Sequence, residues 1–373
     1  MADRSSSIRN VSLVGHGDCG KTTFVEHALL LARKITRAGS VPDGSTVSDH
    51  DPDERERGHS LDTSAMAFEW KGRNLQVVDC PGYPDFRGVA IAGMWSCDTA
   101  AVFVNAVSGI GVNTRRMWSA LTYLGKARVI VISKMDADNA SPQSVLATVQ
   151  RIFGASCLPA NLPVGSGPSF SGVVSCLRAG GDAAPAFGDL AEARNALLEA
   201  IVETDDELLD QYLGGEEISA DALDEALRVA VRRGKLVPVL FCSGTTGKGV
   251  PEALDFLAEF APSAAKPRGV TARDEAGNEI GLTAEGPFVA SVFKVTTDVH
   301  VGKLSFLRVW RGSLPADGVV WNSSTDSTVK LAHPMSVHGK EHSEVKSVGP
   351  GDIFCVAKVD ELQLCSTVTA PGA

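Results

Sequence analysis

The sequence lacks an apolar run long enough to cross a membrane, and Met1 to Ile8 is polar and rich in serine. A bilayer-spanning helix needs about 20 mostly apolar residues, and a secretory signal needs an apolar core after a basic start. We therefore expect neither a membrane span nor a secretory leader. The sequence predicts a cytoplasmic protein without a membrane partner.

Closely spaced cysteine pairs are also missing. The chain has eight cysteines, none of them in a C-x-x-C pair, and several lie in apolar stretches typical of core strands. Scattered buried thiols fit a reducing compartment, whereas zinc sites and disulfide frameworks favour patterned cysteines. We expect neither zinc nor disulfides.

The chain has no excess of basic charge. Its 45 acidic and 35 basic residues give a formal net charge of −10, which argues against indiscriminate nucleic-acid binding. A local basic face could still dock on RNA. With 373 residues, 44% of them hydrophobic and 21% charged, the chain is long enough for two or three ordinary globular domains.

A glycine-rich stretch near the N-terminus fits the phosphate-binding pattern G-x-x-x-x-G-K-[ST]. An apolar, β-prone run at 10–14 precedes it and a run with helical spacing at 24–32 follows it. In such a loop, backbone N–H groups surround a polyphosphate, the lysine contacts the β- and γ-phosphates, and the threonine hydroxyl ligates Mg²⁺. The predicted nucleotide-binding residues, Lys21 also being catalytic, are Gly15, His16, Gly17, Asp18, Cys19, Gly20, Lys21, Thr22 and Thr23.

A second element lies at the end of a predicted hairpin. Residues 39–60 are polar and acidic without a sustained period, so we expect a long mobile loop there. Two β-like runs, 63–70 and 74–79, follow, and the second ends in Asp79-Cys80-Pro81-Gly82. In P-loop GTPases this D-x-x-G element holds Mg²⁺ through the carboxylate, usually by way of water, and its glycine N–H meets the γ-phosphate.

The next segments alternate between helical and strand patterns. Helical stretches near 85–97 and 114–124 alternate with continuous apolar runs at 100–107 and 127–132. Continuous apolar strands between helices predict a mostly parallel sheet with helices on both faces, an α/β fold. The last run ends in Ser133-Lys134-Met135-Asp136, one residue away from the guanine-recognition pattern N-K-x-D. The Asp136 carboxylate can accept hydrogen bonds from N1–H and N2–H of guanine together, which adenine cannot offer.

These motifs together resemble a known family. Residues 8–139 resemble the GTPase domain of elongation factor G, the translocation factor of bacterial translation. Glu56-Arg57-Gly58 is similar to the E-R-G of its first switch, and Asp85-Phe86 follows D-x-P-G as in DTPGHVDF. Residues 212–217 are similar to the YLGGEE of the family's insert, and residues 237–244 resemble its last strand and final guanine-contacting turn. The resemblance implies that Ser243 and Gly244 contact guanine.

The resemblance also implies the domain organisation. Residues 1–265 would be the GTP-binding domain, with the family's insert at about 140–235, and residues 266–373 would be the β-barrel second domain of translational GTPases. In the insert we expect a Gly/Ala-rich connection at 178–185 and two amphipathic helices, near 205–212 and 221–231. His333, His338 and His342 lack a fourth ligand, so we expect an exposed polar loop there rather than a metal site.

The family's function would then follow. The resemblance implies GTP, GDP and Mg²⁺ as ligands, GTP hydrolysis, and a role in translation elongation on the ribosome, with rRNA and stalk proteins as partners. We expect a monomer. The family continues with further domains, so the chain is either part of a longer factor or a short relative, and by itself it should bind nucleotide without translocating.

Three positions depart from the family's pattern. Its catalytic histidine corresponds to Tyr83, which is nearly neutral at working pH and cannot form an imidazolium, so we expect slow or strongly ribosome-dependent hydrolysis. His16 or His59 could substitute for the missing histidine, but neither has the right sequence position. Ser60 replaces the threonine that ligates Mg²⁺ in the first switch, so the expected metal ligands are Thr22, Ser60 and Asp79. Ser133 replaces the asparagine of the guanine loop.

Two other functions stay open at this point. A tyrosine at the catalytic position also fits a GTP-gated ribosome-binding regulator or protection factor that does not hydrolyse its nucleotide. An ATP-dependent P-loop enzyme is disfavoured by Lys134 and Asp136.

Overall fold

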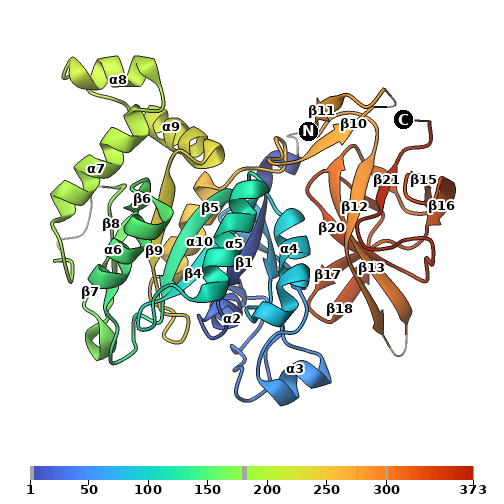
Figure 1. Cartoon of the computed structure of the whole chain (residues 1–373), viewed down its shortest axis with the longest axis horizontal. Helices are drawn as coiled ribbons and strands as arrows, with labels where there is room; N and C mark the ends of the chain where they lie inside the picture. The colour runs from blue at the N-terminus through green and yellow to red at the C-terminus, as the bar shows by residue number, and fades with distance from the viewer. Residues whose placement is uncertain (1–3, 179–182, 275, 299–300, 373) are drawn as a thin grey trace.

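The N-terminal two thirds of the chain fold around a seven-stranded sheet in the computed structural model, which describes residues 4–178, 183–274, 276–298 and 301–372. The strand order is β2-β3-β1-β4-β5-β9-β6, and Figure 1 labels β1, β4, β5, β9 and β6 of this sheet. β2 and β3 form the predicted antiparallel hairpin, and the other neighbours pair in parallel. The strands are β1 (Ile8–Gly15), β2 (Ser64–Trp70), β3 (Arg73–Asp79), β4 (Thr99–Asn105), β5 (Ala127–Ser133), β6 (Cys157–Pro159) and β9 (Val237–Phe241).

Helices cover both faces of this sheet, as predicted. Alternate residues of β4 show why: Ala101 and Phe103 join one apolar cluster, and Ala100 and Val102 join the other. One layer contains α2 (Lys21–Leu31), α7 (Leu190–Val202), α9 (Ala220–Arg233) and α10 (Val250–Phe260). The other contains α4 (Arg87–Trp95), α5 (Val112–Tyr123) and α6 (Pro142–Phe153). Short elements are α1 (Arg4–Ser7), η1 (Pro84–Phe86) and η2 (Gly167–Ser169).

Two expectations about irregular segments need correction. The loop predicted at 39–60 contains a short helix, α3 (Pro52–Arg57), because Asp51 and Glu54 form a capping box and a proline begins the first turn. The insert contains α7 in addition to the predicted α8 (Asp206–Leu213) and α9, and a hairpin of β7 (Asn161–Val164) and β8 (Gly172–Ser175). Of the predicted connection at 178–185, residues 179–182 lie outside the described residues.

The C-terminal part is an all-β domain, also as predicted. Eight strands pair antiparallel in the order β16-β15-β21-β12-β13-β20-β17-β18 around a separate apolar core. They are β12 (Val289–Asp298), β13 (Gly302–Arg311), β15 (Gly318–Asn322), β16 (Ser327–Leu331), β17 (Met335–His338), β18 (Glu341–Glu344), β20 (Ile353–Ala357) and β21 (Thr367–Thr369). Two small ladders flank it, β10 (Thr271–Arg273) with β11 (Glu279–Gly281) and β14 (Leu314–Pro315) with β19 (Ser347–Val348).

The two domains share a buried junction. Arg308 of β13 donates to Asp98 at 2.9 Å, and both side chains are fully buried. The Arg308 guanidinium lies 4.9 Å from the Trp310 ring centroid, and Trp310 packs edge-on against Trp95 of α4. At the β17–β18 turn, the Gly339 N–H donates to the Ala65 carbonyl of β2. The β17–β18 hairpin therefore lies against the first domain.

This hairpin corrects the expectation for the C-terminal histidines. His333 is exposed and ion-paired with Glu344, but His338 and His342 are half-buried on β17 and β18. Seven of the eight cysteines are buried and Cys365 is exposed. No helix in the described part of the chain is long and apolar enough to cross a bilayer.

Candidate nucleotide-binding site

The predicted phosphate loop joins the C-terminal end of β1 to the N-terminus of α2. Gly20 caps α2 with a φ of 82°, and Asp18 has a φ of 56°, so the chain turns tightly and the first amides of α2 are free for an anion. Gly15 cannot be replaced, because a Cβ there would lie 2.6 Å from the Phe103 carbonyl oxygen. Lys21 Nζ donates to the His16 carbonyl at 3.1 Å, across the loop that would hold the phosphates.

Hydroxyl and carboxylate oxygens converge beside this loop. Thr22 Oγ1 donates to Asp79 Oδ2 at 2.7 Å, and Ser48 Oγ donates to the same oxygen at 2.8 Å. Asp79 is 1% exposed, and its Oδ1 has no hydrogen-bond partner among the described residues. Burial raises the pKa of the Asp79 carboxyl, although Lys21 opposes the effect. A buried carboxylate with a free oxygen is a suitable ligand for Mg²⁺ or its waters.

A second carboxylate, Asp49, stands near Asp79. Ser60 Oγ donates to Asp49 Oδ1 at 2.7 Å, while Oδ2 has no partner among the described residues. Burial, and then the charge of Asp79, raise the pKa of Asp49 to about 7. Ser60, predicted as a metal ligand, thus contacts Asp49 rather than Thr22 or Asp79. The oxygen-only donor set fits Mg²⁺.

Sequence reasoning missed Ser48 and Asp49. They lie in the polar segment 39–60, which contains several other acidic residues, and no pattern separates Asp49 from them. The Glu26 carboxylate of α2 accepts the Gly39 and Val47 amides at 2.8 and 2.6 Å, which fixes this segment over α2. In the sequence, the trace of this contact is a glutamate, Glu26, among the apolar residues of the predicted helix at 24–32.

Gly82 lies where the D-x-x-G motif predicts. A Cβ at Gly82 would lie 2.6 Å from Lys21 Nζ and 2.7 Å from Gly17 N, so only glycine fits there. The Gly82 carbonyl accepts from Asn113 Nδ2 at 2.8 Å, and Asn113 is fully buried. Asn113 is a further residue that the motifs did not indicate, and it ties the D-x-x-G turn to α5.

Tyr83 covers the phosphate loop. Its ring atoms would lie 2.9 Å from a Cβ at Gly17, and its Oη donates to Asp18 Oδ2 at 3.3 Å. Partial burial, and then Asp18, raise the pKa of the Tyr83 phenol, so it stays neutral. The His59 ring lies 4.4 Å from the Tyr83 ring, and His59 Nδ1 donates to the Arg57 carbonyl at 3.0 Å. Sequence position alone had not placed His59 beside Tyr83.

The predicted guanine loop stands at the other end of the phosphate loop. Ser133 Oγ donates to the Cys19 carbonyl at 2.5 Å and lies 3.3 Å from the Val104 carbonyl, so serine still ties this strand end to the phosphate loop. Lys134 has a φ of 58° and its side chain lies against Gly20. The Met135 amide donates to the Cys242 carbonyl, which joins the segment containing Asp136 to the predicted final turn.

In the final turn, the Ser243 amide already has an acceptor. The Ser243 N–H already donates to the Lys248 carbonyl at 2.8 Å, and Ser243 Oγ accepts the Thr246 amide. Gly244 packs against the Thr23–Phe24 backbone. Among the described contacts of this turn, the amides of Gly244 and Thr245 have no acceptor, so they are better placed to donate to a base than Ser243.

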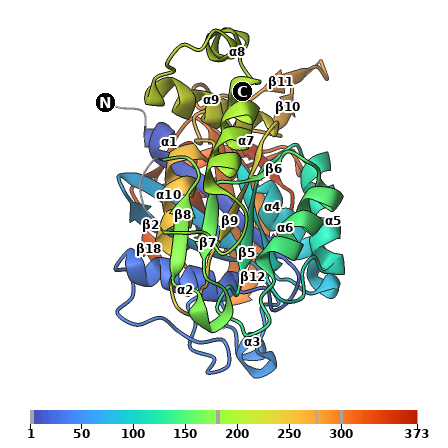
Figure 2. The ribbon, with the colours of Figure 1, turned by 90° about the vertical axis from the view of Figure 1, so that its left-hand side faces the viewer.

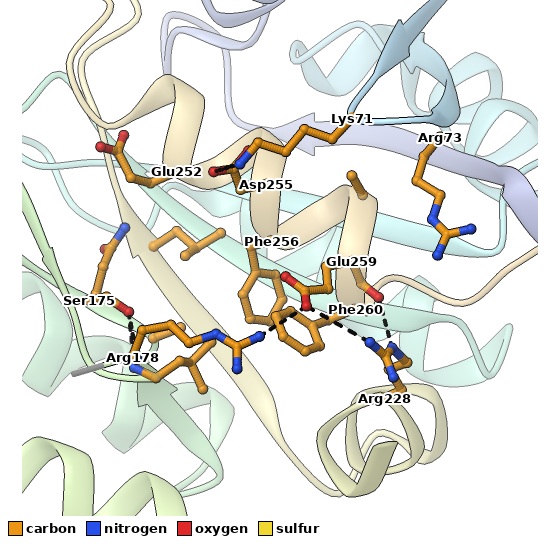
Figure 3. Close-up of a pocket in the computed structure, with 15 residues that line it drawn as sticks. Lys71, Arg73, Ser175, Arg178, Arg228, Glu252, Asp255, Phe256, Glu259 and Phe260 are labelled. Carbon is orange, nitrogen blue, oxygen red and sulfur yellow. Dashed lines mark hydrogen bonds and ion pairs between the residues drawn. The ribbon is translucent and has the colours of Figure 1, made fainter. Parts of the chain in front are cut away.

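Two cavities compete as the candidate site. A cavity of about 290 Å³ is lined by the phosphate loop, parts of the segment 41–60, Gly82 with Tyr83, and Lys134. A larger one, about 530 Å³, lies over α10 and the insert (Figure 3). Its charged groups largely satisfy each other: Lys71 pairs with Asp255, and Arg178 pairs with Glu259. The smaller cavity is the better candidate, because Lys21, Thr22, Gly82 and Asp49 line it and Asp79 lies against Thr22.

The chain is similar to known proteins along nearly its whole length. Residues 6–263 match the family model of the elongation factor Tu GTP binding domain, and residues 287–370 match elongation factor G domain 2. An elongation factor G-like protein of Thermotoga maritima is 32% identical over 95% of this chain and 53% of its own length. Elongation factor G of Neorickettsia sennetsu is 31% identical over 98% of this chain and 55% of its own.

A solved structure is also similar. A crystal structure of a protein from Thermus thermophilus matches with a TM-score of 0.86 and 30% identity, over 99% of this chain and 55% of that one. The chain therefore spans about half the length of the relatives that it matches.

Proposed function

The chain belongs to the elongation factor G family of translational GTPases, and from this premise we propose that it binds GTP and GDP with Mg²⁺ and acts on the ribosome during elongation, at translocation. One observation carries the proposal. The phosphate loop, the D-x-x-G turn and Lys134 line one cavity, with two incompletely paired buried carboxylates beside it.

The proposal gives each group a role. The amides of residues 17–22 and Lys21 hold the phosphates, and Asp136 with the Gly244–Thr245 turn selects guanine. Thr22 and Asp79 hold Mg²⁺, directly or through water, with Ser48, Asp49 and Ser60 around them. When bound, Mg²⁺ would neutralise charge on the phosphates.

We further propose that hydrolysis is slow without the ribosome. The neutral Tyr83 phenol is hydrogen-bonded to Asp18, so it is a weak candidate for orienting the attacking water. The His59 ring beside it keeps an acceptor at Nε2 in its neutral form, because Nδ1 donates to Arg57. These contacts also favour the second candidate function, a GTP-gated ribosome-binding regulator that does not hydrolyse.

Single-turnover GTP hydrolysis with and without ribosomes tests the proposal. We expect the Tyr83→His variant to hydrolyse GTP faster than the parent, by roughly tenfold or more, since a positioned acid–base group typically contributes roughly 10²–10⁴. Tyr123→His, the same substitution at an exposed tyrosine away from the nucleotide site, is the matched control without ribosomes and should leave the rate unchanged. A parent already as fast as Tyr83→His would refute the slow-hydrolysis proposal. Bound GTP that survives ribosome association and release unchanged would favour the regulator.

Three further proposals rest on family membership. We propose a domain boundary near residues 265–266, which the ranges of the two family matches support. We propose rRNA and stalk proteins as partners, with the acidic helices α7 to α9 toward the stalk. We also propose a cytoplasmic monomer.

A further inference from the structure

One face of the first domain is almost free of acidic residues. Between Phe86 and Gly181 the sequence has only three, Asp98, Asp136 and Asp138, although the whole chain has 45. Asp98 is fully buried against Arg308, and the other two lie at the guanine loop. The exposed faces of α5 and α6, which lie in this stretch, therefore have no carboxylate of their own.

These two helices lie side by side (Figure 2). Trp118 of α5 stacks on Phe153 of α6, with ring centroids 4.1 Å apart and planes 15° apart. The Arg128 guanidinium covers Trp118 at 4.4 Å and donates to Thr122 Oγ1. This stack fixes the two helices against each other, so the groups around it keep a constant spacing.

Arginine and tyrosine side chains extend from this surface. Arg115, Arg116 and Arg151 are exposed, and none has an ion-pair partner among the described residues. Tyr123 is 91% exposed at the end of α5, seven residues after Arg116 and hence on the same side of the helix. On a protein of net charge −10, this face would turn toward a polyanion while the rest of the surface is repelled.

We propose that the α5–α6 surface binds RNA, with Arg115, Arg116 and Arg151 on the phosphates and an unpaired base stacked on Tyr123. Arginines neutralise phosphates, and exposed aromatic rings bind unstacked bases of RNA loops. An acidic protein would use the arginines but gains less from an isolated exposed tyrosine. The inference rests on the proposed ribosomal function, since it names the face of the first domain that meets rRNA.

The test is fluorescence anisotropy of a labelled RNA hairpin with an unpaired loop, compared with a labelled polyglutamate peptide. We expect the parent to bind the hairpin with a salt-dependent affinity. Arg115→Glu/Arg116→Glu should bind at least roughly tenfold more weakly, and Tyr123→Ala roughly tenfold more weakly. Arg33→Glu/Arg37→Glu, an equal charge change on exposed residues elsewhere, should stay within about twofold.

Each variant's GDP affinity is measured in parallel, so that loss of folding is separated from loss of RNA binding. If the parent and Arg115→Glu/Arg116→Glu bind RNA equally well, the α5–α6 surface is not the RNA-binding site. If the parent binds polyglutamate more tightly than RNA, the partner is an acidic protein and not RNA. If Tyr123→Ala binds RNA as tightly as the parent, no base stacks on Tyr123. If the parent does not bind GDP, the proposed function is wrong, whatever the RNA result.

Discussion

Two buried aspartates of this chain lie in opposite situations. Asp98, at the domain junction, receives a charged hydrogen bond from Arg308, and both side chains are fully buried. Asp79, in the nucleotide site, is equally buried but receives only two hydroxyl hydrogen bonds on one oxygen. A buried ion needs a partner or a raised pKa. Asp98 Oδ1 and Arg308 Nη1 also lack hydrogen-bond partners among the described residues, but the two charges at the junction balance each other, whereas the nucleotide site is built to receive a cation.

The same substitution at both aspartates should have opposite consequences for folding. Asp98→Asn leaves Arg308 buried without its counter-charge, close to the Lys126 ammonium. We expect a loss of about 3–5 kcal/mol in the free energy of unfolding, measured by urea denaturation. Asp224→Asn, which breaks the half-exposed pair with Arg178, is the control and should cost at most about 1 kcal/mol. Equal losses for Asp98→Asn and Asp224→Asn would mean that burial does not make the Asp98–Arg308 pair more important for stability than an exposed pair.

Asp79→Asn should leave the unfolding free energy of the nucleotide-free protein unchanged or higher, because it removes a buried charge that Lys21 compensates only in part. It should weaken Mg²⁺-dependent GDP affinity by roughly 10–100-fold, as expected when a group around a metal is lost. Calorimetric GDP titrations with and without Mg²⁺ measure this. A variant that unfolds as easily as Asp98→Asn, with normal GDP affinity, would reverse the comparison.

Lys126 gives the junction a pH dependence. Its ammonium donates to the Trp95 and Arg268 carbonyls, and burial lowers its pKa to about 8. Between pH 8 and the unfolded pKa near 10.5, Lys126 is mostly deprotonated in the folded protein but protonated in the unfolded chain. Because the unfolded chain then binds more protons, the free energy of unfolding rises with pH in this window, by at most about 1.4 kcal/mol per pH unit. Lys126→Met should remove that rise. Parallel stability–pH curves of the parent and the variant above pH 8 would contradict the account.

The smallest expected effect connects the two regions. Gly339 has a φ of 57°, and a Cβ there would lie 2.6 Å from the Val47 carbonyl, one residue before Ser48. Gly339→Ala should weaken Mg²⁺–GDP binding several-fold, by about 1 kcal/mol, because the second domain would displace the segment that contacts Asp79. Gly72→Ala has a similar φ of 73° but open space, so it controls for backbone strain alone. Equal GDP affinities of the two variants would exclude this connection.

The sequence predicts the parts of the molecule whose chemistry is local. The strand–loop–helix at Lys21, the turn at Gly82 and the alternation of apolar strands with helices depend on neighbours in the chain, and the structure has them. Ser48, Asp49 and Asn113 could not be found in this way, because tertiary contacts from Glu26 and Gly82 determine where they lie. The half-buried His338 and His342 were missed for the same reason, since their burial depends on docking against the first domain.

The unpartnered oxygens of Asp49 and Asp79 and the phosphate loop are proposed to form one site for Mg²⁺ and a guanine nucleotide. The most direct test of this proposal is side-by-side titration of the chain with labelled GDP and ADP, with Mg²⁺ and then with excess EDTA. We expect GDP to bind at least about a hundredfold more tightly than ADP, and EDTA to remove most of that affinity. Comparable affinities for GDP and ADP, or GDP binding that EDTA leaves unchanged, would contradict it.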